Sequence, residues 1–333
     1  MAVNTIIIGA GIAGLTAAAE LQKNNVPYVL LEKAPIAGGR LATMTLQNGG
    51  RADTAAQFFT TRTLDFKATV SEWLDAGLAF EYTTEWSDGS LKRYHSNGEP
   101  RYAINGGMSD LVDYLANQLT SLQLNRAVRN ISWQSGHWVV DMGNDYQLTS
   151  ESLIITIPAP QAVALVSGVP LGDMTKLALK RINYPSNLTA VFAVDGDTAL
   201  PASGGLQLKD TDSPLYWIVD NKTKGISSER VITVQAERLW SKHNYGLDDD
   251  AILTDLSEAL KPFLADDAVI TEAILVRWDN AAPMSTHPDY ILQDEALPII
   301  FAGDGFGGRG RVEGAFLSGL MAARTLIPNH ETY

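Results

Sequence analysis

Residues 3–32 read VNTIIIGAGIAGLTAAAELQKNNVPYVLLE, and this stretch decides the fold of the N-terminal part of the chain. Val3–Ile8 predict a short buried strand, because they are mostly apolar and rich in β-branched side chains. A G-x-G-x-x-G array follows, then Leu15–Lys23 with helical spacing, then a second apolar strand over Val26–Leu31. A strand, a glycine turn, a helix and a strand within about thirty residues are typical of a dinucleotide-binding βαβ unit.

The three glycines of the array have separate roles in such a unit. Gly9 permits the tight turn, Gly11 lets the backbone approach a pyrophosphate, and Gly14 lets the helix pack closely on the strand. The helix N-terminus offers free N–H groups to the phosphates. Glu32, which ends the second strand, can accept hydrogen bonds from an adenosine ribose and would repel a 2′-phosphate, so NADP is disfavoured at this site. The unit alone does not distinguish FAD from NAD.

A second glycine pair lies just after the βαβ unit. Gly38-Gly39-Arg40 resembles the G-G-R signature of the flavin amine oxidase superfamily, which includes monoamine and polyamine oxidases, protoporphyrinogen oxidase and phytoene desaturases. The resemblance implies that Arg40 lies beside the FAD pyrophosphate and ribityl chain. The alternative is a glycine turn that carries a solvated arginine.

The C-terminal part supplies a second anchor. Leu297–Phe301 predict a buried strand, followed by a glycine-rich loop and a helix over roughly 312–326. The resemblance implies that Asp304 hydrogen-bonds a ribityl hydroxyl and that the helix beginning at Val312 directs its N-terminus at the flavin pyrimidine edge. Such an N-terminus also suits reduced flavin, which carries negative charge near N1. NAD enzymes need no second anchor, so the two ends together favour FAD, held non-covalently in a chain without cysteine.

The glycine motifs and the resemblance together predict a set of FAD-binding residues. The set comprises Gly9, Gly11, Ile12, Ala13, Gly14, Glu32, Lys33, Gly39, Arg40, Leu41, Ala56, Gln57, Phe58, Val128, Gly303, Asp304, Arg311, Val312, Glu313 and Ala315. The resemblance places Val128 near the adenine, and an ordinary core valine is an equal reading.

The predicted fold class is α/β, with a glutathione-reductase-type Rossmann-like domain that binds FAD and carries a β-meander. The meander strands are 127–134, 137–142 and 146–149, and 153–157 return to a buried strand. A mixed α+β substrate domain on an antiparallel sheet completes the prediction, with helices over 64–82 and 251–263 and strands over 188–194 and 231–236. We expect a discontinuous FAD-binding domain of residues 1–67, 103–163 and 283–331, and a substrate domain of 68–102 and 164–282.

Several local strings resemble bacterial renalase-like proteins. They are 53–60 (DTAAQFFT), 100–111 (PRYAINGGMSDL), 214–222 (PLYWIVDNK) and 303–319 (GDGFGGRGRVEGAFLSG). The resemblance implies an oxidase that takes hydride from 2- or 6-dihydro isomers of NAD(P) and passes electrons to O2. Its departures are Ala55, where glycine is usual, and the run 279–282, which replaces an expected aromatic and leaves the substrate less defined than the cofactor.

No catalytic residue is predicted, because hydride transfer to flavin needs proximity and a water-poor pocket and no nucleophile. Pocket candidates are Gln57, Phe58, Trp217 and Trp278, although both tryptophans read equally as core. Asn221 and Lys222 read either as substrate ligands or as a solvated turn. Arg309 and Arg311 are candidates for a substrate phosphate or the FAD pyrophosphate.

Two other functions remain open. One is an amine oxidase or desaturase on the same fold, although residues 307–312 offer no tyrosine for an aromatic cage. The other is a flavin protein that senses NAD(P) redox state without turnover.

Composition limits the partners. The chain has 25 Lys+Arg against 38 Asp+Glu, a net charge of −13, which argues against nucleic acid and against a polybasic membrane anchor. No cationic segment precedes the apolar N-terminal stretch, so we expect no signal peptide and a cytoplasmic location. The five histidines are scattered, so no metal site is predicted, and the oligomeric state is not indicated.

Overall fold

The computed structural model describes residues 2–87, 94–208, 213–308 and 310–328. The chain forms two compact units by its internal contacts. Unit 1 comprises residues 1–39, 112–184 and 282–333, and unit 2 comprises 40–111 and 185–281. These units are defined by internal contacts, whereas the predicted FAD-binding and substrate domains are defined by what they bind. The bounds of those two domains therefore stay a prediction.

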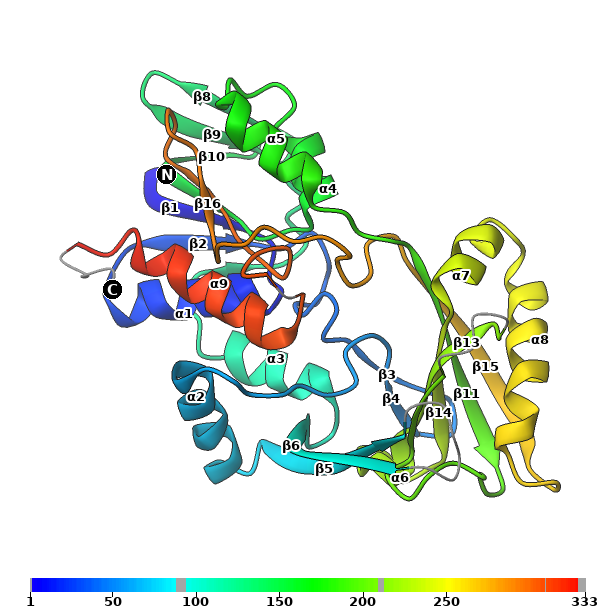
Figure 1. The fold of residues 1–333 in the computed structure, drawn as a ribbon. Coiled ribbons are helices and arrows are strands. Elements are labelled where there is room, and N and C mark those ends of the chain that lie inside the picture. Colours follow the sequence, from blue (N-terminus) through cyan, green and yellow to red (C-terminus); the bar gives the residue numbers. More distant parts are fainter. Residues whose placement is uncertain (1, 88–93, 209–212, 309, 329–333) are drawn as a thin grey trace. The chain divides into compact units, whose positions relative to one another are not determined.

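The sheet of unit 1 has the order β16-β17-β10-β1-β2-β7, in which the strands from β17 to β7 run parallel. Figure 1 labels β16, β10, β1 and β2 of this sheet. The apolar side chains on both faces of β1, β2 and β10 are buried, as the sequences of these strands predict. β16 runs antiparallel to β17, and the hairpin β8–β9 continues antiparallel from β10. The strands are β1 (Ala2–Ile8), β2 (Tyr28–Leu31), β7 (Leu122–Gln123), β8 (Asn130–Gln134), β9 (His137–Asp141), β10 (Gln147–Ile155), β16 (Leu292–Gln293) and β17 (Ile299–Phe301).

Two helices of unit 1, α1 (Ile12–Lys23) and α9 (Val312–Arg324), lie side by side on one side of this sheet (Figure 1). Their backbones approach closely, since a Cβ added at Gly319 would lie 2.0 Å from the carbonyl oxygen of Ala13. Glycine at this position is therefore required for the two helices to pack. On the other side of the sheet lie α4 (Ala159–Leu165), α5 (Asp173–Arg181) and the hairpin β8–β9.

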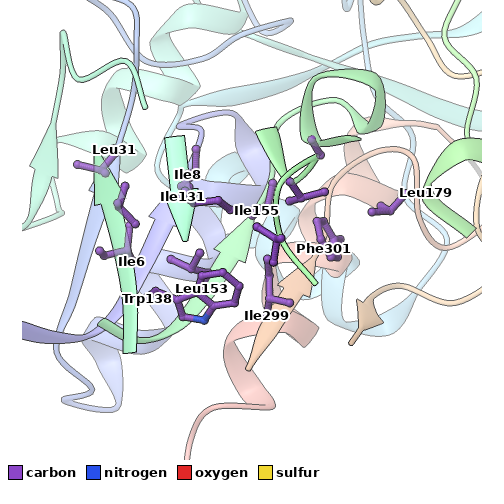
Figure 2. Close-up of a cluster of buried hydrophobic side chains, with 14 of the residues drawn as sticks. Ile6, Ile8, Leu31, Ile131, Trp138, Leu153, Ile155, Leu179, Ile299 and Phe301 are labelled. Atoms are coloured by element: carbon purple, nitrogen blue, oxygen red, sulfur yellow. The ribbon is translucent and has the colours of Figure 1, made fainter. Parts of the chain in front are cut away.

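The apolar core on that second side joins strands that are distant in sequence. Figure 2 shows Ile6 of β1, Leu153 of β10 and Ile299 of β17 in one cluster with Trp138 of β9. The Trp138 side chain is fully buried, and its indole Nε1–H donates to the carbonyl oxygen of Pro298 at 3.0 Å. The indole thus fills the core without leaving its polar atom unpaired.

The sheet of unit 2 has the order β15-β11-β14-β13-β12-β5-β6 and is antiparallel except for the pair β12–β5. Its strands are β5 (Ala79–Ser87), β6 (Tyr94–Ile104), β11 (Asn187–Asp195), β12 (Gly205–Gln207), β13 (Leu215–Asp220), β14 (Val231–Ala236) and β15 (Val269–Trp278). A separate hairpin is formed by β3 (Thr43–Thr45) and β4 (Arg51–Asp53). The remaining helices are α2 (Leu64–Asp75), α3 (Met108–Ala116), α6 (Asn221–Lys224), α7 (Arg238–Asn244), α8 (Asp249–Leu260) and the 3-10 turn η1 (Lys261–Phe263).

Strand β11 is covered on both faces. Leu188, Ala190 and Phe192 belong to a cluster with apolar residues of α8, whereas Val191 and Ala193 pack with residues of the hairpin β3–β4. The period of two in a strand sends alternate side chains to opposite faces. Double coverage explains why this strand reads as an almost unbroken apolar run.

Two sequence predictions of secondary structure were wrong. The helix predicted over 64–82 ends at Asp75, because Gly77 adopts a left-handed φ of +67° and the chain then enters β5 at Ala79. The strands predicted over 146–149 and 153–157 are a single strand, β10, which runs through the polar residues between them. Those polar residues are accommodated because Ser150 Oγ donates to the carbonyl oxygen of Ser152 at 2.8 Å.

No helix in the described ranges combines the length and the apolar character that a membrane span requires.

Asp294 gives unit 1 a pH-dependent contribution to stability. Its carboxylate accepts hydrogen bonds from the backbone N–H of Gly172 at 2.8 Å and of Ala296 and Leu297 at 3.1 Å. Burial would raise the pKa of Asp294, but these hydrogen bonds and one from the Thr175 hydroxyl hold it below its ordinary value.

We expect Asp294→Ala to lower the free energy of unfolding at pH 7 by about 1–3 kcal/mol, because three backbone donors lose their acceptor. A depressed pKa stabilises the fold above the unfolded-state pKa of about 4, and this contribution disappears as the pH falls through the folded-state value. Urea unfolding of wild type and variant at neutral and acidic pH should therefore show a difference that shrinks in acid. A difference that is constant with pH would contradict this role.

Candidate functional site

The glycine loop of unit 1 is shaped by two positions that do not tolerate a side chain. Gly9 has a left-handed φ of +104°, and a Cβ there would lie 2.8 Å from Cγ2 of Ile157. A Cβ at Gly14 would lie 1.9 Å from the carbonyl oxygen of Gly9. Both glycines are therefore needed by the turn and by helix packing, whatever binds to the loop.

Gly11 is different, because nothing within the protein excludes a side chain there. Its φ is −75°, and a Cβ would meet no heavy atom within 4 Å. Gly11 is also the N-cap of α1, and no side chain caps this helix end. The loop thus leaves open space beside free N–H groups, a cradle that suits a phosphate.

Glu32 is held next to the same loop. One carboxylate oxygen accepts the backbone N–H of Ala10 at 2.8 Å, and the other accepts the N–H of Ala34 at 2.9 Å. Each oxygen keeps a further lone pair, so the carboxylate can also accept hydrogen bonds from ribose hydroxyls. The neighbouring Lys33 side chain is exposed.

The segment that carries Val128 lies beside Glu32. The N–H of Arg126 donates to the carbonyl oxygen of Glu32 at 2.7 Å, and the N–H of Asn125 donates to that of Ala34 at 3.0 Å. Val128 is half-buried and packs against the core of unit 1. The structure therefore brings Glu32 and Val128 into one region, which is compatible with an adenosine site and with a core role for the valine.

The second glycine pair joins the first glycine loop. Gly38 has a φ of +119°, and its N–H donates to the carbonyl oxygen of Ala10 at 2.8 Å. Gly39 has a φ of +55°, and a Cβ there would meet no heavy atom within 4 Å. The G-x-G-x-x-G array and the first two residues of G-G-R thus form one surface of backbone atoms.

The C-terminal anchor follows β17. The N–H of Gly303 donates to Ser318 Oγ on α9 at 2.7 Å, which ties the loop to the helix. Asp304 Oδ1 accepts the hydroxyl of Tyr184 at 2.7 Å. Helix α9 begins at Val312 and has no side-chain cap at Arg311, which is exposed. Glu313 and Ala315 are buried in the first turn, and Arg309 lies outside the described residues.

Arg40 begins unit 2, and its guanidinium Nη1 donates to the carbonyl oxygen of Ala281 at 2.6 Å. Its own carbonyl oxygen accepts the N–H of Ala56 at 3.2 Å, and that of Ala42 accepts the N–H of Thr54 at 2.9 Å. The segment 53–57 therefore runs along residues 40–42, of which Leu41 is buried.

The four pocket candidates all belong to unit 2. Phe58 and Trp217 contact each other edge to face, with ring centroids 6.0 Å apart. Gln57 is buried, and its amide donates to the carbonyl oxygen of Asp53 at 2.8 Å. Trp278 Nε1 donates to the carbonyl oxygen of Thr54 at 3.3 Å. The structure thus gathers Phe58 with Trp217 and attaches Gln57 and Trp278 to the segment 53–57.

The prediction that Asn221 forms a solvated turn or a substrate ligand was wrong. Its side chain is fully buried, and its amide donates to the carbonyl oxygen of Val231 at 3.0 Å and to Thr233 Oγ1 at 2.9 Å. Only Lys222 of this pair is exposed. Sequence reasoning also missed Tyr184, the partner of Asp304, because a single tyrosine in a loop carries no recognisable pattern.

Comparison with known families decides the identity. The family described as "Flavin containing amine oxidoreductase" matches residues 66–327, and the family described as "NAD(P)-binding Rossmann-like domain" matches residues 7–73. The chain belongs to the flavin-containing amine oxidoreductase family. It is an FAD-dependent oxidoreductase, and the predicted cofactor is confirmed.

Solved structures show the same fold as this flavin-containing amine oxidoreductase. A wild-type putrescine oxidase bound to putrescine aligns with a TM-score of 0.72 at 15% identity, over 98% of this chain and 99% of the other. A protein named as a candidate protoporphyrinogen oxidase, from Exiguobacterium sp. 255-15, aligns with a TM-score of 0.73 at 12% identity, over 97% and 98%. The predicted fold class is therefore confirmed.

The residues of unit 1 fit FAD. The space at Gly11, the uncapped start of α1 and the carboxylate of Glu32 match a pyrophosphate and a ribose in that order along the loop. The chain contains no cysteine to form a thioether with the flavin. The individual contacts to FAD stay predictions.

We expect Glu32→Ala to weaken FAD binding by about 1.5–3 kcal/mol, since charge-assisted hydrogen bonds to the ribose are lost. The variant should also unfold more easily, because Ala10 and Ala34 lose their acceptor. Glu20→Ala is the matched control, since it removes a carboxylate from α1 that pairs with Arg324 at 3.5 Å. Fluorescence titration with FAD should separate the two variants, and equal affinities would contradict the assignment of Glu32.

Proposed function

We propose that this oxidoreductase is an oxidase of the renalase type. Its substrate would be a dihydronicotinamide dinucleotide, a 2- or 6-dihydro isomer of NAD(P), and O2 would accept the electrons. The observation that carries the proposal is the resemblance of residues 303–319 (GDGFGGRGRVEGAFLSG) to bacterial renalase-like proteins. The strings around Gln57 and Trp217 carry the same resemblance and support it. We further propose a cytoplasmic location and an FAD-binding domain of residues 1–67, 103–163 and 283–331.

The chemistry asks little of the side chains. FAD, when bound, supplies the hydride acceptor. The substrate loses a hydride and becomes the aromatic nicotinamide. The two electrons and the proton of that hydride, together with one proton from solvent, then reduce O2 to hydrogen peroxide. The protein has to hold the nicotinamide ring of the substrate parallel to the flavin ring and exclude water from the pocket. The edge-to-face pair Phe58–Trp217 offers an apolar aromatic surface for this purpose, with ring centroids 6.0 Å apart.

A cationic group is also needed for the substrate phosphates in a chain with a net charge of −13. Arg101 is a candidate within unit 2, since its guanidinium lies 5.5 Å from the centroid of the Phe58 ring. Arg311, at the N-cap of α9, is a second candidate, and Arg309, the third, lies outside the described residues. Each would act as a phosphate ligand in this proposal.

Oxidation of a small amine is the second candidate function, favoured by the description of the family itself. The residues 307–312 argue against it, because they contain no tyrosine to flank the flavin face. A flavin protein that senses NAD(P) redox state without turnover is the remaining alternative.

Anaerobic mixing with candidate substrates tests the proposal. We expect 2- or 6-dihydro-NAD(P) to reduce the flavin under anaerobic conditions, so that its visible absorbance disappears on mixing. Admission of air should then restore the absorbance and form hydrogen peroxide. Putrescine and benzylamine serve as comparison substrates. Bleaching by the amines alone would assign the second function. Bleaching by a dihydronicotinamide without reoxidation in air would contradict the oxidase and favour the sensor.

A further inference from the structure

Unit 2 contains a buried ion pair that the proposed chemistry does not use. Lys224 Nζ, at the end of α6, lies 2.5 Å from Asp53 Oδ2, at the end of β4, and both side chains are fully buried. Burial lowers the pKa of Lys224, and the neighbouring Asp53 carboxylate opposes this shift. A buried ion pair often stabilises a fold no better than apolar side chains of the same volume, so stability alone does not explain why these two charges are buried here.

The pair is fixed from several directions. Asp53 Oδ1 accepts the hydroxyl of Thr43 at 2.6 Å and the backbone N–H of Met108 at 2.8 Å. Lys224 Nζ also donates to Gln57 Oε1 at 3.5 Å. The lysine therefore holds the oxygen end of the Gln57 amide, while the nitrogen end of the amide donates to the carbonyl oxygen of Asp53 at 2.8 Å.

The backbone that follows Asp53 is held in the same way. Its carbonyl oxygens accept hydrogen bonds from side chains of the antiparallel sheet: that of Asp53 from Thr233 Oγ1 at 2.9 Å and that of Ala55 from Gln235 Nε2 at 2.6 Å. On its other edge, the N–H of Ala56 donates to the carbonyl oxygen of Arg40 at 3.2 Å. The segment 53–57 thus connects the ion pair to Arg40.

We infer that the Asp53–Lys224 pair is a positioning device for the flavin, which fixes the amide of Gln57 and the backbone at Arg40 in one orientation. The inference rests on the proposed placement of Arg40 and Gln57 at the flavin. Lys224 contacts no reacting atom in this account and acts through Gln57. An apolar replacement of the pair would keep the volume and lose the donor that orients the amide.

The test compares four variants of the full-length holoenzyme: Lys224→Met, Asp53→Asn, the double variant, and Arg230→Met as a matched control. Arg230 pairs at 3.6 Å with the buried Asp220 in the same unit and makes no hydrogen bond to the segment 53–57 among the contacts described. For each variant we would measure the FAD dissociation constant, the visible flavin spectrum, the flavin midpoint potential and the urea midpoint of the apoprotein.

We expect both single variants to bind FAD at least about tenfold more weakly, with shifted flavin bands, and to unfold at lower urea, because one charge is left buried without its partner. The double variant should recover much of the unfolding midpoint but not the FAD affinity or the spectrum. Arg230→Met should lower the urea midpoint and leave the FAD affinity, the flavin spectrum and the flavin midpoint potential at wild-type values.

Two results would overturn the inference. The first is wild-type affinity, spectrum and potential in Lys224→Met or in the double variant, whatever the change in stability. The second is a loss of affinity that follows the urea midpoint in all four variants, since the pair would then only stabilise the unit. If the single variants do not fold, the double variant decides. None of these readouts involves a substrate, so failure of the proposed renalase-type activity would be seen separately, in the anaerobic assay of the wild type.

Discussion

Gly11→Ala is expected to weaken FAD binding about ten- to hundredfold, about 1.5–3 kcal/mol, while leaving the fold unchanged. The added Cβ meets no protein atom within 4 Å, and the φ of −75° suits alanine, so the free protein has no reason to shift. The methyl group would occupy the space in which a pyrophosphate approaches the backbone. Titration of the apoprotein with FAD and urea unfolding measure the two effects independently.

Gly14→Ala is the matched control within the same motif. Its Cβ would lie 1.9 Å from the carbonyl oxygen of Gly9, so we expect the free energy of unfolding to fall by about 3 kcal/mol or more. The two alanine variants therefore separate the glycine that serves the ligand from the glycine that serves the fold. Wild-type FAD affinity in Gly11→Ala would contradict the assignment of the cradle.

Asp304→Ala is expected to have an effect of similar size on FAD, because a charge-assisted hydrogen bond to the ribityl chain would be lost, at about 1.5–3 kcal/mol. Tyr184→Phe is the comparison, since it removes the hydroxyl that donates to Asp304 Oδ1 at 2.7 Å and keeps the carboxylate. We expect a smaller loss of affinity in Tyr184→Phe than in Asp304→Ala. Full FAD occupancy in Asp304→Ala after dialysis would show that the C-terminal anchor is assigned wrongly.

The parts of the fold that were predictable have local causes. The βαβ unit is recognisable in the sequence because its strand, its left-handed turn at Gly9 and its helix with Gly14 lie within about thirty residues. The structure contains β1, α1 and β2 at that position. The helix beginning at Val312 also has a contiguous pattern, which the structure confirms. Gly11, by contrast, is explained by no contact within the protein, so its presence in the pattern already pointed to a ligand.

Most of the parts that were missed depend on distant contacts. The end of the helix predicted over 64–82 is the exception, because the left-handed Gly77 stops it locally, and Ala79–Ser87 then form a strand that pairs with β6 and β12. Asp53 and Lys224 are 171 residues apart in the sequence. No sequence pattern around either residue indicates that its charged side chain is buried. Asn221 was misread for the same reason, since its partners lie on β14. Burial of polar side chains depends on tertiary packing. It produces no periodic pattern in the sequence from which it could be predicted.

Non-covalent binding of FAD in the cradle at Gly9–Gly14 is the central assignment for this protein, and one measurement tests it. The purified full-length chain is denatured, the polypeptide is removed, and the FAD in the supernatant is compared with the amount of protein. We predict a yellow protein that releases FAD in an amount equal to that of the chain and leaves a colourless precipitate. A colourless protein that takes up no added FAD, or flavin that stays with the precipitated polypeptide, would contradict the account.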